Sequence, residues 1–150
     1  MQYKQNPLFT TGFYLNLPEQ NKIQTVMDIF NQKFLKDLLL QAEANPRHRQ
    51  HYDLRTSAAD TSQRMLNALL PDTEVPIHKH DDTSETVVCL MGKLEEILYN
   101  ENKEEISRHL LCPAEGSFGM QIPAGVWHTI RVLEPSVIFE AKDGAFRPRE

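Results

Sequence analysis

Hydrophobic positions along the chain follow two different periods. Between Asn31 and Ala44 the apolar residues recur every three to four positions, which is the spacing of one buried helix face. Asn31 stands where an N-cap residue is favoured. Pro46 ends the helix, because proline lacks an amide donor and disfavours helical geometry in the residue before it. The pattern therefore predicts one helix over residues 31–44 and a polar loop over 47–61.

Beyond the loop the apolar residues alternate in short runs separated by Pro, Gly, Asn and Asp, which is typical of an antiparallel sandwich or barrel. We expect strands over residues 63–70, 73–80, 85–91, 93–99, 104–111, 117–122, 126–133 and 136–142. So many strands predict an all-β fold, a single jelly-roll antiparallel barrel with an N-terminal helix. We expect residues 1–30 to form an N-terminal arm and residues 31–150 to form the domain.

The run over residues 86–91 is apolar at both strand parities. A strand of this kind is buried on both faces. The barrel interior covers one face, and a second layer or a second subunit covers the other. We therefore predict a homodimer.

Composition and charge exclude several partners. The chain has 150 residues, enough for one domain with a sizeable core. Its net charge of -5 offers no basic field for phosphate backbones, so we expect no nucleic-acid partner. No apolar stretch approaches the roughly 18 to 20 residues of a membrane span, and residues 1–25 lack the pattern of a signal peptide. With only Cys89 and Cys112, we predict a cytoplasmic protein without a disulfide framework or a membrane partner.

Four candidate metal ligands occur in two short stretches. His78 and His80 lie two apart, so on a strand their imidazoles point to the same face. Glu85 has the opposite parity, but the polar residues 81–84 supply a turn after which it can face back toward the pair. His128 follows a Pro-x-Gly turn and can join from a distant strand. Three imidazoles and a carboxylate suit one divalent transition metal ion (Fe, Mn, Ni, Co or Zn) with positions open for water or substrate.

The alternative is that these are four ordinary polar residues at the mouth of a barrel. It requires four matching residue types at matching positions by chance, so we favour the metal site. The other histidines, His48, His51 and His109, belong to no ligand-spaced motif and are expected to be non-ligands.

At these residues the chain resembles the cupin superfamily. The first motif reads H-x-H-x4-E-x6-G from His78 to Gly92, and the second reads P-x-G-x2-H from Pro123 to His128. The resemblance implies a small antiparallel barrel in which the matching histidines and glutamate bind a single metal ion. The chain departs from the usual pattern at flanking turn positions, where a glycine, a glycine and an asparagine are replaced by Asp72, Ser117 and Val132.

The chain is more closely similar to the WbuC-type cupin-fold metalloproteins of bacteria, over residues 31–148. The likeness rests on the histidine block and on residues 46–49, 63–69, 122–129 and 139–144. Members of that family often occur among genes for surface polysaccharide synthesis, so the resemblance implies sugar chemistry.

Two further pairs are candidates for substrate binding. Gln63 and Asn67 share one strand parity, so both can line the cavity. Arg47 and Arg49 are able to clamp an anionic substrate, although two solvated loop arginines explain the same residues.

Glu140 and Lys142 are the candidate catalytic residues, because they share a parity on the last predicted strand. A carboxylate and an amine beside a metal can serve as acid and base. The alternative is a solvated edge strand of alternating charge.

These features predict a mononuclear metal enzyme that acts on a small polar molecule by Lewis-acid catalysis, with sugar isomerisation or epimerisation as a fitting reaction. Other cupins imply that the same ligands also support a metal-dependent dioxygenase. A non-catalytic module that binds a small molecule is the second alternative. A purely structural metal is disfavoured, because structural sites are closed.

Overall fold

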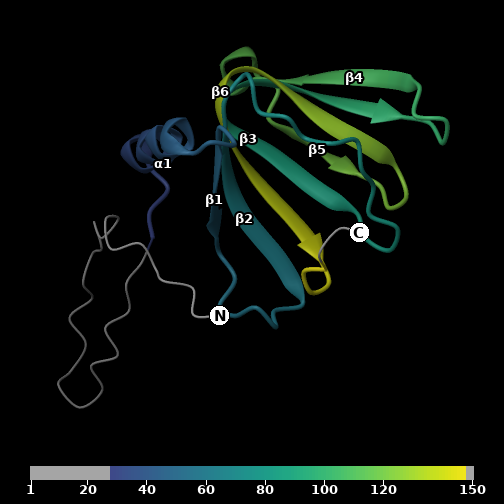
Figure 1. Cartoon of the computed structure of the whole chain (residues 1–150), viewed down its shortest axis with the longest axis horizontal. Helices are drawn as coiled ribbons and strands as arrows, with labels where there is room; N and C mark the ends of the chain where they lie inside the picture. Colours follow the sequence, from purple (N-terminus) through teal and green to yellow (C-terminus); the bar gives the residue numbers. More distant parts are fainter. Residues whose placement is uncertain (1–27, 148–150) are drawn as a thin grey trace.

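The computed structural model of the chain describes residues 28–147 (Figure 1). The predicted arm over residues 1–30 lies outside the described residues except for its last part, 28–30. The described elements, in chain order, are α1 (Gln32–Ala44), β1 (Arg49–Asp53), β2 (Ser62–Leu69), β3 (Glu85–Tyr99), β4 (Glu105–Leu111), the short 3-10 helix η1 (Pro113–Glu115), β5 (Gly119–Ile122) and β6 (Trp127–Asp143).

Helix α1 confirms the helix predicted from the apolar period. The Asn31 side chain caps it by accepting a hydrogen bond from the Phe34 amide at 3.0 Å. The helix ends one residue before Asn45, which adopts extended backbone ahead of the proline. Its buried residues are Phe34, Leu35, Leu38 and Ala42.

The strands form one antiparallel sheet of order β1-β2-β6-β3-β4, with β5 paired to β3 (Figure 1). The first part of β3 pairs with β5 and its last part pairs with β4, while β6 pairs with β3 along nearly its whole length. Register shifts between Cys89 and Leu94 mark the bend at which both long strands cross from one side of the barrel to the other. The predicted jelly-roll antiparallel barrel with an N-terminal helix is therefore confirmed.

Two pairs of predicted strands are each one long strand, because the chain bends at the predicted breaks without leaving the sheet. Residues 85–91 and 93–99 both belong to β3, and the predicted strands 126–133 and 136–142 both belong to β6 except for residue 126. Gly92 sits at the bend with a φ of 91°, and a Cβ there would lie 2.3 Å from the Pro135 carbonyl oxygen. Only glycine fits this crossing of the two strands.

Two other predictions were wrong. The predicted loop over residues 47–61 contains β1, an edge strand in which Tyr52 packs on α1 and the alternate residues face solvent. The predicted strand over residues 73–80 is only an isolated bridge between His78 and His128. Pro76 interrupts that stretch, because it has no amide to donate to a ladder.

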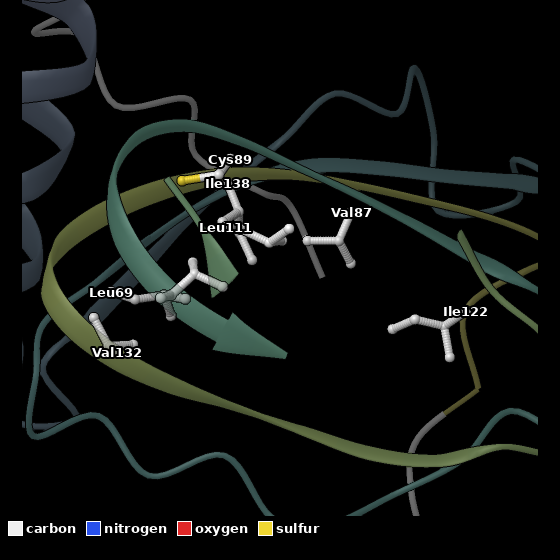
Figure 2. Close-up of a cluster of buried hydrophobic side chains, with 8 residues drawn as sticks. Leu69, Val87, Cys89, Leu111, Ile122, Val132 and Ile138 are labelled. Atoms are coloured by element: carbon white, nitrogen blue, oxygen red, sulfur yellow. The ribbon is translucent and has the colours of Figure 1, made fainter. Parts of the chain in front are cut away.

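Two apolar clusters fill the fold. The barrel core lies inside the barrel (Figure 2) and consists of Leu69, Val87, Cys89, Leu94, Leu111, Ile122, Val132 and Ile138. The helix-facing cluster lies between α1 and the outer face of the sheet and consists of Phe34, Leu35, Leu38, Ala42, Leu66, Ala68 and Val137. Helix α1 is thus a second layer over β1, β2 and β6.

The outer side of β3 is only partly covered within one chain, since Leu90 remains 38% exposed. The homodimer stays a prediction. Within residues 28–147, no helix combines the length and the apolar character needed to cross a membrane.

Candidate metal centre

Four side chains from three segments converge at one end of the barrel. They are His78 and His80 from the segment before β3, Glu85 at the start of β3, and His128 near the start of β6. Their ligand atoms all lie within 4.8 Å of one another. A two-way backbone bridge holds the segments together, since the His78 amide donates to the His128 carbonyl at 3.0 Å and the reverse bond is 2.8 Å.

Backbone carbonyls orient two of the imidazoles. Nδ1 of His78 lies 2.9 Å from the Pro76 carbonyl oxygen, and Nδ1 of His128 lies 2.9 Å from the Val126 carbonyl oxygen. A carbonyl oxygen can only accept, so each Nδ1 carries the proton. In the neutral form of each ring Nε2 then keeps a lone pair, and this is the form that ligates a metal.

The donor set fits a divalent transition metal. Oε2 of Glu85 lies 2.7 Å from Nε2 of His80 and 3.7 Å from Nε2 of His128. Nevertheless Oε2 of Glu85 and Nε2 of His128 are buried without a hydrogen-bond partner. Two buried polar atoms thus lie close together without forming a hydrogen bond to each other. A cation bound between them would coordinate both and so compensate for the missing hydrogen bonds.

The charges around Glu85 favour its ionised form. Burial acts to raise the pKa of this carboxyl group, but His128, His80 and the ammonium group of Lys142 outweigh burial and hold the pKa below its usual value. Nζ of Lys142 lies 3.8 Å from Oε2 of Glu85 and 3.3 Å from Nε2 of His80. Glu85 is thus a carboxylate at neutral pH, as a metal ligand must be.

The sheet register places the candidate catalytic pair beside the centre. Lys142 pairs with Glu85 on one side and with Gln63 on the other. Glu140, two residues earlier on the same face, accepts a hydrogen bond from Nδ2 of Asn67 at 3.3 Å. Burial and the negative charge of Glu85 raise the pKa of Glu140 to about 7. The structure thus places Lys142 and Glu140 beside the candidate ligands. Gln63 and Asn67 lie on the same interior face, where Asn67 contacts Glu140 and Nε2 of Gln63 donates to the Gly144 carbonyl oxygen at 3.2 Å. The roles of all four residues stay predictions.

The structure does not bring the two arginines to the centre. Arg47 is exposed in the loop before β1, and Arg49 pairs with Leu69. Lys142, which contacts the candidate ligands, pairs with Gln63, and Gln63 lies six positions before Leu69 on β2. At a strand rise of about 3.3 Å per residue, Arg49 therefore lies roughly 20 Å along the strand from the centre.

The remaining histidines lie outside the cluster, as expected. Nδ1 of His48 contacts Oδ2 of Asp72, and Nε2 of His109 lies 3.1 Å from Oγ of Ser107. His51 is exposed on β1.

Sequence reasoning missed one charged residue of the barrel interior, Glu96. It is fully buried on β3, where it shares a face with Leu94 and Leu98. The signal was present in the sequence, because a glutamate that alternates with two leucines on a strand occupies an interior position.

The barrel and its convergent ligands define a cupin-fold protein with a candidate metal centre. Residues 30–111, more than half of the chain, match the family described as "Domain of unknown function (DUF6016)", and the chain belongs to this family. A comparison with curated proteins finds no match.

Solved structures of cupin-fold proteins resemble the chain at low sequence identity. The protein TT1209 from Thermus thermophilus has a TM-score of 0.56 and 24% identity, over 79% of this chain and 98% of that one. KdgF from Halomonas sp. has a TM-score of 0.52 and 16% identity, over 69% and 83%. The capsular polysaccharide assembling protein CapF from Staphylococcus aureus has a TM-score of 0.55 and 20% identity, over 69% of this chain and only 30% of CapF. These likenesses establish the fold.

Proposed function

We propose that the chain is a mononuclear metal-binding cupin that acts as an enzyme on a small, polar, oxygen-rich molecule. The observation that carries the proposal is the convergence of three imidazoles and one carboxylate within 4.8 Å, in the interior of a barrel. Closed structural zinc sites usually recruit cysteine, whereas three histidines with a carboxylate suit a centre that keeps positions for a ligand.

The residues beside the centre support proton transfer. A divalent ion bound by His78, His80, Glu85 and His128 supplies Lewis-acid polarisation of a carbonyl or hydroxyl oxygen. Glu140, whose pKa of about 7 lies near physiological pH, is suited to take up and return a proton. Asn67 orients this carboxyl group through its hydrogen bond to Oε2.

The proposed reaction is the isomerisation or epimerisation of a sugar derivative. Both reactions move a proton between carbon and a base next to a polarised oxygen, which the Glu140 carboxyl group and the metal site can support together. The resemblance to the WbuC-type cupins supports surface polysaccharide synthesis as the setting. The fold likeness to CapF, named as a capsular polysaccharide assembling protein, agrees with it.

Elemental analysis of protein purified without chelators or a histidine tag tests the proposal. We expect near-stoichiometric transition metal in the parent and almost none in His128→Ala, which removes a buried ligand. His109→Ala is the matched control, because His109 is exposed and lies outside the cluster. The metal-loaded parent should also catalyse exchange of carbon-bound protons of aldoses, ketoses or sugar acids with D2O, followed by NMR.

Two results would contradict parts of this proposal. A parent that holds no metal even after reconstitution, or a folded His128→Ala variant that holds as much metal as the parent, rejects the metal centre. A metal-loaded parent that exchanges no proton favours the non-catalytic binding module instead.

A further inference from the structure

Glu96 occupies a position in the barrel where an aliphatic residue would normally pack. Its neighbours across the sheet are Ile130 of β6 and His109 of β4. Leu94 and Leu98 flank it on the same face of β3. The side chain is 0% exposed, so it is enclosed within the barrel rather than reaching solvent at the rim.

Neither carboxyl oxygen of Glu96 has a hydrogen-bond partner among residues 28–147. A buried carboxyl group without a partner destabilises the fold, and a leucine at this position would not. Burial, together with the negative charges of Glu85 and Glu140, raises the pKa of Glu96 well above its ordinary value. A raised pKa favours the protonated form of this group, in which it carries a proton that it can donate.

The sheet register places Glu96 next to the metal ligands. Leu98 pairs directly with His128, and Glu96 lies two residues from Leu98 on the same interior face. Glu96 and His128 are thus diagonal neighbours, with Cα atoms roughly 7 to 8 Å apart, which is within reach of long side chains. The proximity of Glu85 and Glu140, whose charges act on Glu96, agrees with this placement.

We infer that Glu96 is a ligand-binding residue of the barrel interior and donates a hydrogen bond to a carboxylate oxygen of the small molecule held at the metal centre. The inference rests on the proposed function and narrows its substrate class to a molecule that bears a carboxylate, such as a sugar acid or another hydroxy acid.

A carboxylate is the group that best matches the donors in this interior. It accepts hydrogen bonds only, and charged acceptors form stronger hydrogen bonds than neutral ones. The ammonium group of Lys142 lies in the same interior, with its side chain 19% exposed, and adds a positive charge. A neutral sugar hydroxyl can also accept a hydrogen bond, but it carries no negative charge and forms a weaker bond with these donors.

Two hydroxy acids that differ by one carboxylate test the inference. Lactate and malate both offer an α-hydroxy carboxylate to a metal, and malate adds a second carboxylate that can reach Glu96. Each acid is titrated into the Co(II)-loaded protein, and binding is followed by the visible absorption of the metal. We expect the parent to bind malate more tightly than lactate. Glu96→Leu should weaken malate binding by roughly 10- to 100-fold and leave lactate binding unchanged.

Glu95→Gln is the matched control. Glu95 is the adjacent residue on β3 but lies on the outer face, where Nη1 of Arg108 contacts its Oε2 at 2.7 Å. This variant should keep the parent's preference for malate. An equal loss in Glu95→Gln and Glu96→Leu would overturn the inference, because it would show a general effect of altering the strand.

Infrared difference spectroscopy gives a readout that does not depend on the leucine variant. The carbonyl stretching band of a protonated buried carboxyl group should be present in the parent, shift when malate is added, and be absent from Glu96→Gln. A band that malate leaves unchanged would overturn the inference.

Three further outcomes distinguish a failure of the inference about Glu96 from a failure of the proposed function. A parent that binds Co(II) but does not prefer malate overturns the role of Glu96 and leaves the metal centre intact. Unfolding temperatures below the parent's in both Glu96→Leu and Glu96→Gln, with malate binding unchanged, would assign Glu96 a structural role instead. A parent that binds no Co(II) contradicts the proposed function itself.

Discussion

The helix-facing cluster and the barrel interior are buried to a similar degree but differ in their polar content. The helix-facing cluster is built from apolar side chains alone. The barrel interior holds every buried side-chain polar atom that lacks a hydrogen-bond partner in the described part of the chain, and these atoms belong to Asn67, Glu85, Glu96 and His128. This is the difference expected if the outer layer supplies stability and the interior holds the proposed binding site, whose polar groups lower stability.

The same strands build both regions. On β2, Leu66 and Ala68 face the helix, while Asn67 and Leu69 face the interior. Strand side chains alternate between two faces, so a single residue step separates a position in the helix-facing cluster from one in the barrel interior.

Leu38→Ala should have the largest effect on stability and none on the metal centre. Leu38 is 1% exposed in the helix-facing cluster, and its truncation should lower the free energy of unfolding by about 2–5 kcal/mol, measured by chemical denaturation. Leu40→Ala, at a residue 61% exposed on the same helix, is the control and should change stability by less than about 0.5 kcal/mol. A loss of metal in Leu38→Ala would break the comparison, because it would show that the two regions are coupled.

Glu140→Gln should change how stability depends on pH. The pKa of Glu140 in the folded protein, about 7, lies above the ordinary value of 4.5, so its contribution is fully present below about pH 4.5 and is lost as pH rises through 7. The metal-free parent should therefore lose on the order of 1–3 kcal/mol between pH 5 and pH 8 through this group.

Thermal unfolding of metal-free Glu140→Gln and parent across this pH range measures the effect. The variant should show a flatter profile, because glutamine does not titrate. Parallel profiles would mean that Glu140 does not cause the dependence of stability on pH. They would also weaken the contrast in polar content between the barrel interior and the helix-facing cluster.

Asn31→Ala should have the smallest effect of the three. It removes the side-chain oxygen that accepts from the Phe34 amide and should lower stability by about 1 kcal/mol, measured by urea denaturation. Asn31→Asp keeps an acceptor and should remain close to the parent. If alanine is tolerated without loss, packing of the helix-facing cluster alone holds the start of α1.

Local sequence signals predicted the helix and the four residues that converge as the candidate metal site, three of them in one stretch. The 3-to-4 period of α1 and the spacing of His78, His80 and Glu85 each depend on residues close in the chain. The sequence pattern predicts strand ends where β3 and β6 only bend, because glycine and proline, here Gly92 and Pro135, commonly interrupt strands. The sequence does not predict β1, because this edge strand covers only one apolar side chain, Tyr52. Its apolar and polar residues therefore show almost no alternation.

The sequence by itself determined the helix, the alternation of the strands and the identity of the four candidate ligands, because each follows from side-chain periods or short motifs of a few residues. Only the tertiary structure decided which distant residues meet. It set Lys142 opposite Glu85, placed Arg49 of β1 opposite Leu69 at the far end of β2, and enclosed Glu96 without a partner among the described residues. These outcomes depend on strand register and barrel closure, which arise from contacts between residues far apart in the chain.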